Sequence, residues 1–297
     1  MNQALSVSII VLCYNRSFLL QKYLERLVPQ LKTKDRVIVV NNGSALEETR
    51  KIEQIIKDLR KDRKGKIFLI KGDKKSNIPR GRNLGIKVAK QKSQIIASQD
   101  DDCLPDKNWL ERVKSEHKSH PNWGVIQGRI ISIPKISLYA RITSLNYQNW
   151  LKSNLINKNQ LLTFDSKNVS FKAKLFQSGI KFNEEYERSS DIELGQNLRK
   201  MGYKIGYSSK IKAYHQERTS LLPFLKQHYH IARGESKTGI NLFPERYYYH
   251  LASLSHLAWE LIKEKKLVSS IKLLALVPVI LIVRAGIFLS RPLQYKS

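Results

Sequence analysis

Acidic residues and cysteines are scarce in this sequence of 297 residues. Asp and Glu number 25 against 53 Lys and Arg, and the formal net charge of +28 predicts anionic partners such as a membrane surface, nucleotide phosphates or nucleic acid. Two cysteines exclude a disulfide framework and fit a reducing compartment. No basic stretch precedes an apolar one at the N-terminus, so a cleaved signal peptide is not expected. The apolar share of 41% is sufficient for a buried core.

Long apolar runs are missing as well. The segment Leu273–Val283 is apolar throughout, but a membrane span needs about 20 such residues. Basic residues flank this segment, in Lys263–Lys266 before it and at Arg284 after it. We therefore expect a membrane-associating helix at about residues 267–290 that lies in the interface of an anionic membrane surface. A true membrane span and a soluble core helix are the two alternatives.

Short β-branched runs alternate with segments that carry apolar residues at helical spacing. This alternation predicts an α/β fold with a mostly parallel, Rossmann-like sheet that is covered by helices on both faces. The expected strands are Ser8–Leu12, Arg36–Val40, Lys66–Ile70, Gln94–Ser98 and Trp123–Gln127. The expected helices are Phe18–Leu31, Leu46–Arg60, Arg82–Lys90 and Asn108–His117. A later region, Leu161–Gln216, has the pattern strand, helix, acidic loop, helix, strand.

Three adjacent carboxylates, Asp100, Asp101 and Asp102, close the fourth expected strand. On an extended segment Asp100 and Asp102 project to one side and Asp101 to the other. Two carboxylates held so close repel each other unless a cation lies beside them, and Mg²⁺ or Mn²⁺ with a phosphate-bearing substrate fits such ligands. The alternative is an acidic loop that ends a strand in solvent. The polar run Asn41–Ser44 also follows a strand, and ligands of such sheets bind beyond the carboxyl ends of the strands.

Four motifs of the first half, taken in order, resemble the nucleotide-sugar glycosyltransferases of the GT-A fold, specifically glycosyltransferase family 2. They are Val7–Arg16 with Tyr14-Asn15, Val39–Ser44, Gly81-Arg-Asn-Leu-Gly85, and the Asp-x-Asp pair Asp100 and Asp102. The resemblance implies that the nucleotide sugar is contacted by Tyr14, Asn15, Asn41, Asn42, Gly43, Arg82, Asn83, Asp100 and Asp101. Leu12 replaces the family's proline, and Asn41 holds the position of an acidic residue that contacts the nucleobase, which leaves the choice of base open.

The resemblance continues to about residue 217. The later motifs are Gly128-Arg129, Asn168–Phe171, Gly179–Glu184, Ser190–Gly195, Leu198–Tyr203 and Lys212–Gln216. The family assignment implies Asp191 as catalytic base and Asp100, Asp102 and His215 as ligands of Mn²⁺ or Mg²⁺. Ser190 replaces the usual Glu. The Gln-x-x-Arg-Trp of processive members is not found after this region, which favours single-sugar transfer.

From these motifs we expect a catalytic domain at 1–220, with a nucleotide-sugar half at about 1–130 and an acceptor half at 131–220. A basic helical region would follow at 221–297. The expected function is inverting, metal-dependent transfer to a glycan or lipid-linked acceptor, typical of polysaccharide biosynthesis, at the cytoplasmic face of a membrane. Two alternatives remain: an inactive protein of the same fold, and a basic nucleic-acid-binding protein. No nucleic-acid-binding motif is found, so nucleic acid is not an expected partner.

Three of these residues, Asp191, His215 and Arg129, also have an interpretation that involves no catalysis or ligand binding. Asp191 and Glu193 would also favour the first turn of a helix through its macrodipole. His215 either binds the metal or hydrogen-bonds a strand end. Arg129 is equally consistent with a surface charge.

Overall fold

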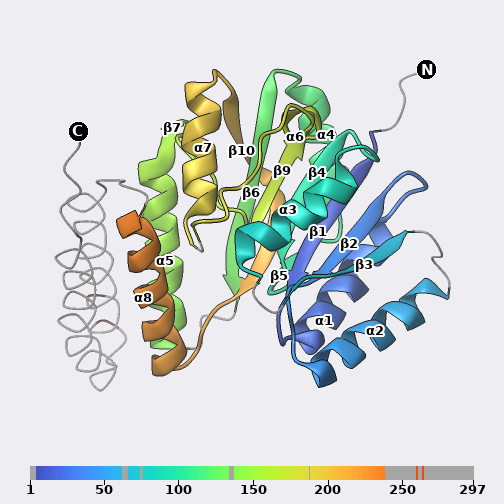
Figure 1. The fold of residues 1–297 in the computed structure, drawn as a ribbon. Helices are drawn as coiled ribbons and strands as arrows, with labels where there is room; N and C mark the ends of the chain where they lie inside the picture. Colours follow the sequence, from blue (N-terminus) through green and yellow to red (C-terminus); the bar gives the residue numbers. More distant parts are fainter. Residues whose placement is uncertain are drawn as a thin grey trace. The chain divides into compact units, whose positions relative to one another are not determined.

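The structure is a computed structural model that describes residues 5–61, 66–73, 76–133, 137–186 and 188–237, together with Trp259 and Lys263. The chain divides into two compact units. The first contains residues 1–131 and 155–215, and the second contains residues 132–154 and 216–297. Figure 1 shows the fold.

Strands and helices alternate through the first half, as the hydrophobic pattern predicts. The strands are β1 (Val7–Cys13), β2 (Arg36–Asn41), β3 (Ile67–Lys71), β4 (Ile95–Asp100), β5 (Cys103–Pro105), β6 (Trp123–Ile133), β7 (Leu155–Asn157), β8 (Gln160–Leu161), β9 (Asn168–Lys172) and β10 (Lys204–Gln216). The helices are α1 (Ser17–Leu27), α2 (Leu46–Arg60), α3 (Ile78–Ala89), α4 (Trp109–Ser119), α5 (Leu138–Asn154), α6 (Lys174–Gln177), α7 (Ser190–Lys200) and α8 (Leu221–Lys237), with a 3-10 helix at Val28–Gln30. The predicted pattern of strand, helix, loop, helix, strand is confirmed as β9, α6, a loop, α7 and β10.

In the described part of the chain, ten strands form one sheet in the order β3-β2-β1-β4-β9-β6-β10-β8-β7, with β5 paired to β10. The predicted parallel arrangement holds for β3-β2-β1-β4. From β4 onward the pairs change: β9 runs antiparallel to both β4 and β6, and β5 and β8 run antiparallel to β10. The sheet therefore has a parallel half, in which β1, β2 and β4 end at one edge, and a second half with antiparallel pairs.

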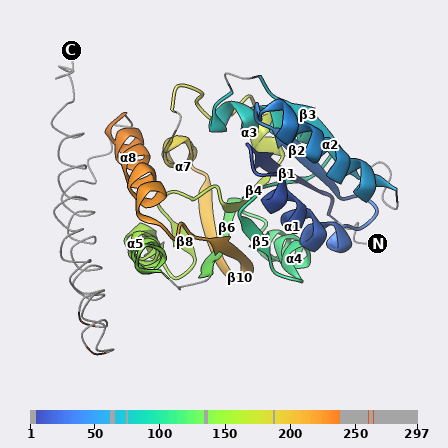
Figure 2. The ribbon, with the colours of Figure 1, turned by 90° about the horizontal axis from the view of Figure 1, so that it is seen from below.

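Both faces of the parallel half are covered by helices. Alternate residues of β1, such as Ile9 and Val11, belong to one buried core together with apolar residues of α1, α2 and α4. The residues between them face α3, since Ile10 and Leu12 lie against the glycines of that helix. Figure 2 shows α1 and α3 on opposite sides of these strands. Continuous burial of β1 follows from this arrangement and explains why all of its residues except Ser8 are apolar.

In the second unit, Phe224 of α8 is fully buried, and its ring centroid lies 5.4 Å from that of Tyr139 on α5.

Within the part of the chain that the structure describes, none of the helices combines the length and the apolar character that a membrane span requires. The expected membrane-associating helix at 267–290 lies outside the described residues. The expected division of the chain at residue 220 remains a prediction.

Candidate active site

The candidate site begins at the edge where the parallel strands end. In the register of the sheet, Cys13 of β1 pairs with Asn41 of β2, and Leu12 pairs with Asp100 of β4. The polar residues that follow these strands therefore start from the same edge, which is the arrangement that the sequence predicted.

Asn15 joins the loops that follow β1 and β2 at this edge, and Asn41 fixes the second of these loops. Asn15, with φ of 53°, donates its backbone N–H to Ser44 Oγ at 2.9 Å, and its Oδ1 accepts from the Ala45 N–H at 2.8 Å. The Oδ1 of Asn41 accepts from the Ser44 N–H at 3.0 Å, while its Nδ2 donates to Thr49 Oγ1 at 2.9 Å. Both ends of the Asn41 amide are therefore engaged inside the chain, at the position for which the resemblance implies a contact with the nucleobase.

The other residues of these loops differ in exposure. Tyr14 is 56% exposed, so its ring is accessible to a ligand. Gly43 has φ of 86°, a left-handed conformation that favours glycine in the turn after β2. Asn42 is buried, and its Oδ1 accepts from Ser76 Oγ at 2.6 Å. Of the predicted nucleotide contacts in these loops, Asn15, Asn41 and Asn42 thus have internal structural partners.

In the motif Gly81–Gly85 on α3, the glycines and the arginine have different roles. A Cβ added to Gly81 would collide with Asn42 Oδ1, and one added to Gly85 would collide with a methyl carbon of Ile10. These glycines allow α3 to pack directly on β1 and on the loop after β2. The close packing brings the buried Arg82 to Asp100, with its Nη2 3.1 Å from Asp100 Oδ1.

Asn83, the next residue, faces the loop that precedes α7. Its Oδ1 accepts from the Phe182 N–H at 3.0 Å, and its Nδ2 donates to the Phe182 carbonyl at 2.9 Å. The same Nδ2 lies 2.9 Å from Glu184 Oε1. Asn83 was predicted as a nucleotide contact. In the structure its amide attaches this loop to α3, and the nucleotide contact remains a prediction.

The three carboxylates at the end of β4 do not continue as an extended strand. The strand ends at Asp100, and the chain turns at Asp101 and Asp102 before β5. The alternation that the sequence predicted for these side chains therefore does not apply. Instead, one guanidinium contacts two of them: Arg16 Nη2 lies 2.5 Å from Asp101 Oδ1, and Arg16 Nη1 lies 2.6 Å from Asp102 Oδ2.

Burial and charge set the protonation of this cluster. Asp101 is fully buried, and the loss of solvation raises its pKa to about 7, with the neighbouring Asp102 and Asp100 adding to the rise and Arg16 opposing it. For Arg16, burial acts against the charged form, but Asp102 and Asp101 prevail and raise the pKa of the guanidinium. Arg16 therefore stays cationic. It was not predicted as a site residue, and its only sequence signal is its position directly after Tyr14-Asn15.

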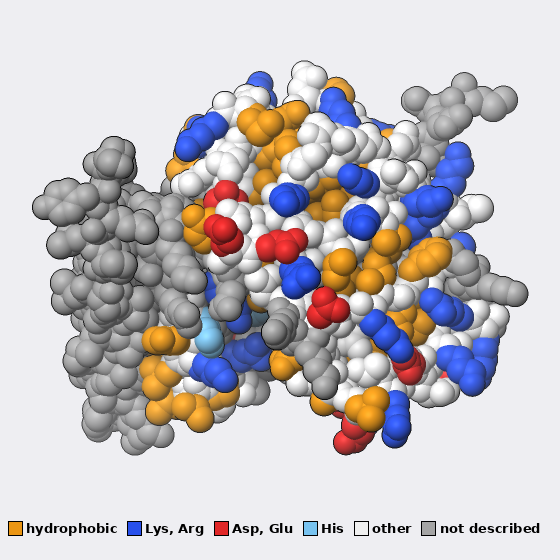
Figure 3. Space-filling model, in the orientation of Figure 1, with side chains coloured by type: hydrophobic (Ala, Val, Ile, Leu, Met, Phe, Trp, Pro, Cys, Tyr) orange, Lys and Arg blue, Asp and Glu red, His pale blue; other side chains and the backbone are white. Residues whose placement is uncertain are grey.

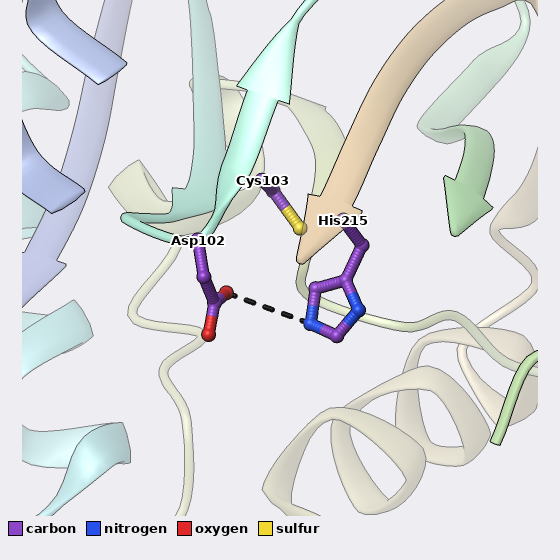
Figure 4. A group of neighbouring side chains, drawn as sticks. All are labelled: Asp102, Cys103 and His215. Carbon is purple, nitrogen blue, oxygen red and sulfur yellow. Dashed lines mark ion pairs between the residues drawn. The ribbon is translucent and has the colours of Figure 1, made fainter. Parts of the chain in front are cut away.

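Asp102, Cys103 and His215 form a group with metal-binding geometry, because one donor atom from each lies within 4.8 Å of the others (Figure 4). Asp102 precedes β5 and His215 stands near the end of β10, which pairs with β5. The Oδ1 of Asp102 lies 3.6 Å from His215 Nε2. Asp100, which was predicted as a third ligand, forms an ion pair with Arg82, and its role as a ligand remains a prediction.

The donor set fits a divalent cation of the Mn²⁺ type. Burial raises the pKa of the Cys103 thiol well above its ordinary value, so the thiol stays protonated and is a poor ligand. The remaining donors are a carboxylate oxygen and an imidazole nitrogen, and Mn²⁺ accepts both, whereas Mg²⁺ favours oxygen alone. Two ligand atoms at about 2.1 Å from an ion and at a right angle lie about 3.0 Å apart. The observed 3.6 Å needs only a small side-chain adjustment.

Asp191 lies in the first turn of α7, and both of its carboxylate oxygens are held. Oδ2 accepts from the Ser166 N–H at 3.1 Å and from Ser166 Oγ at 2.9 Å, while Oδ1 accepts from the Ile192 N–H at 3.0 Å. The bond from the Ile192 N–H is what a carboxylate in the first turn of a helix is expected to accept. The two bonds from Ser166 come from outside the helix and fix the orientation of the carboxylate. Ser166 was not predicted, because its partner is 25 residues away in sequence.

One loop borders both parts of the site. Asp165 and Lys167 act electrostatically on the Cys103 thiol, and Ser166 between them bonds Asp191. Gln127 of β6 fixes this loop, because its Oε1 accepts from the Asp165 N–H at 2.7 Å. Arg129, two residues further along β6, is exposed.

A family model described as Glycosyl transferase family 2 matches residues 8–180. This match covers more than half of the chain, and the chain belongs to that family, whose members are glycosyltransferases. No curated protein sequence matches it.

Several solved structures share the fold at low sequence identity. The mannosyltransferase PcManGT from Pyrobaculum calidifontis, in complex with GDP-Man and Mn²⁺, has a TM-score of 0.66 at 14% identity, over 97% of this chain and 88% of that chain. GalNAc-T7 with UDP, GalNAc and Mn²⁺ has a TM-score of 0.60 at 11% identity, over 79% and 48%. S. aureus TarS 1-349 with UDP-GlcNAc has a TM-score of 0.54 at 16% identity, over 80% and 67%. These likenesses show that the fold is that of the GT-A glycosyltransferases.

Proposed function

We propose that this protein transfers a single hexose from a nucleotide-diphosphate sugar to a glycan or lipid-linked acceptor, with a divalent cation and with inversion at the anomeric carbon. The observation that carries the proposal is the pair of Asp102 and His215, whose donor atoms lie 3.6 Å apart, beside the Arg82–Asp100 ion pair. These groups stand where the parallel strands end, which is where such sheets bind nucleotides.

In this proposal the donor lies along the strand edge. Arg82 would contact the nucleotide diphosphate, and Asp100 and Tyr14 would face the sugar nucleotide. Asp102 and His215 would hold the cation, which when bound neutralises the charge that develops on the departing diphosphate. Mn²⁺ is favoured over Mg²⁺ because one of the two donors is an imidazole nitrogen. The structures of PcManGT and GalNAc-T7 that share this fold also contain Mn²⁺.

Asp191 would act as the general base of the transfer. The acceptor hydroxyl oxygen forms a bond to the anomeric carbon, and its proton passes to the Asp191 carboxylate. The bond from that carbon to the diphosphate oxygen breaks, and its electron pair leaves with the nucleoside diphosphate. One base and one displacement invert the configuration. The two hydrogen bonds from Ser166 keep the carboxylate in a single orientation for this step.

The acceptor and the place of action follow from charge and from the C-terminal sequence. The net charge of +28 and the flanked apolar segment after Lys263 support an anionic membrane surface as a partner. Nucleotide sugars are cytoplasmic, so we place the catalytic domain, residues 1–220, at the cytoplasmic face of a membrane. A membrane-proximal or lipid-linked glycan is then the acceptor.

An inactive protein of the same fold is the second candidate. It is favoured by Asn41, whose amide is engaged with Ser44 and Thr49 at the position where the family reads the base. Retention of Asp102, His215 and Asp191 favours the enzyme.

The test is thermal stabilisation by GDP-Man and UDP-GlcNAc, each with and without Mn²⁺. We expect at least one donor to raise the melting temperature only when Mn²⁺ is present, and Asp102→Asn to abolish this effect. Asp58→Asn, at a half-exposed surface position of α2, is the matched control. Mn²⁺-dependent stabilisation that persists in Asp102→Asn would contradict the metal assignment, and donor binding without any release of nucleoside diphosphate would favour the inactive protein.

A further inference from the structure

Arg16 connects two of the carboxylates at the site. Its Nη1 lies 2.6 Å from Asp102 Oδ2, and its Nη2 lies 2.5 Å from Asp101 Oδ1. The other oxygen of Asp102, Oδ1, is the one that lies 3.6 Å from His215 Nε2. We propose that Arg16 is a positioning residue for the metal site: it holds one oxygen of Asp102 so that the other faces the cation. The inference rests on the cation-binding role of Asp102 in the proposed function.

The physical reason is the freedom of an aspartate side chain. The terminal torsion of Asp is broad, so an Asp without a partner does not favour one carboxylate orientation. The rigid guanidinium binds one oxygen of Asp101 and one oxygen of Asp102, so it holds the two carboxylates at a fixed separation and keeps Oδ2 of Asp102 turned toward itself. Groups of this kind behind a metal ligand commonly account for 10- to 100-fold in metal affinity, as an order of magnitude.

Arg16 itself has a fixed backbone. Its carbonyl accepts hydrogen bonds from the Leu19 and Leu20 N–H groups at 3.0 and 3.1 Å, which start α1. The preceding Asn15 is held by Ser44 and Ala45 of the neighbouring loop. The side chain is only 31% exposed, so it has little room to leave the carboxylates. Arg16 is therefore a built part of the site and not a mobile surface charge.

A purely electrostatic role predicts the opposite result. If Arg16 acted only as a counter-charge, it would compete with the cation, and its removal would tighten metal binding because Asp102 would lose a neighbouring positive charge. Positioning predicts weaker binding after the same change. The sign of the effect therefore distinguishes the two roles.

The experiment measures Mn²⁺ binding to the full-length protein without nucleotide, by the electron paramagnetic resonance signal of free Mn²⁺. We expect the Kd to rise about 10- to 100-fold in Arg16→Gln. Arg16→Lys keeps the charge but loses the fork, so its Kd should also rise by about 10-fold or more. Arg16→Lys also provides the test if Arg16→Gln does not fold, which metal-free thermal melting will show. The control is Lys22→Gln, which removes one positive charge from α1, the helix that directly follows Arg16; the Lys22 ammonium lies 4.2 Å from the Phe18 ring centroid.

Unchanged or tighter Mn²⁺ binding in Arg16→Gln, or wild-type affinity in Arg16→Lys, would overturn the positioning role while leaving the proposed function intact. Wild-type protein that binds no Mn²⁺ would overturn both the positioning role and the metal part of the proposed function.

Discussion

Two arginines share the three carboxylates that end β4. Arg82 pairs with Asp100, and Arg16 pairs with Asp101 and Asp102. Without these cations, three adjacent carboxylates at a buried strand end would repel one another and favour protonation. The ion pairs thus place positive charge beside all three carboxylates, and in the proposed function Asp102 also binds a divalent cation. They also give each carboxylate a different neighbour, since Asp102 faces His215, Asp100 meets α3 and Asp101 is buried against Arg16.

At the same scale, Asp191 is the residue whose role can be tested most directly. We expect Asp191→Asn to lower the turnover number by about 10²-fold or more, because an amide accepts no proton, while nucleotide-sugar binding stays nearly unchanged. Turnover of the donor with an acceptor glycan and calorimetric donor binding are the two measurements.

Ser166→Ala is the companion variant for this test. It removes the hydroxyl bond to Asp191 and leaves the backbone bond, so it should reduce turnover less than Asp191→Asn does. If Asp191→Asn kept full turnover, Asp191 would be only a helix-start carboxylate.

At the scale of elements, α3 and α4 show how helices are fitted to the sheet. Gly81 and Gly85 bring α3 close to β1, and this closeness sets the position of Arg82. On the other face, α4 buries His117, whose Nε2 lies 2.9 Å from Ser170 Oγ on β9. Burial lowers the pKa of His117 to about 3, with Lys172 and His120 adding to the effect. The imidazole is therefore neutral in the folded protein.

This burial predicts a pH dependence of stability. Above about pH 6.5 the imidazole is neutral in both states and contributes nothing to the difference. As the pH falls below that value, the unfolded chain takes up a proton that folded His117 does not, so stability is lost at about 1.4 kcal/mol per pH unit. We expect the destabilisation caused by His117→Gln to be smaller at pH 5 than at pH 7.5 by about 2 kcal/mol.

Urea unfolding at the two pH values measures this difference. His120→Gln is the matched control, since it removes a half-exposed imidazole that stacks on Trp123 at the same helix end. An equal cost of His117→Gln at both pH values would show that the buried imidazole takes up its proton in the folded state.

At the scale of the molecule, charge is the dominant property. Lys and Arg side chains are spread over the face shown in Figure 3, among polar and apolar ones, and do not form a single patch there. A distributed positive charge favours attraction to an anionic surface over recognition of one acidic ligand. We therefore expect the charge to act on a membrane through many weak contributions.

We expect the full-length protein to sediment with anionic vesicles and much less with neutral ones, because each surface-proximal Lys or Arg contributes roughly 1 kcal/mol. Salt at about 1 M, where the Debye length is about 3 Å, should weaken the charge contribution and leave that of the apolar segment. A chain that ends at Ile262 should remain in the supernatant and still bind the donor. Full-length protein that stays in solution with anionic vesicles would refute the membrane partner and the inference about the acceptor.

The sequence determined the elements and their order. The apolar runs predicted β1, β2, β4 and the helices between them, because burial on both faces requires continuous apolar strands. The order of the motifs identified the family, and the family match over residues 8–180 confirms it. Placement of polar residues after these strands followed from the topology of parallel sheets.

Only the tertiary structure decided which side chains meet. Asn83 hydrogen-bonds the Phe182 backbone, and Ser166 hydrogen-bonds Asp191. Arg16 forms ion pairs with Asp101 and Asp102. These contacts join residues 25 to 99 positions apart in sequence, and no local pattern encodes them. The alternation argument for the three carboxylates failed for the same reason: it assumed an extended strand, whereas the chain turns after Asp100 to place Cys103 beside β10. The hydrophobic periodicity of a sequence indicates which face of a helix or strand is buried. Which side chain of a distant loop contacts a given residue depends on how the whole sheet packs.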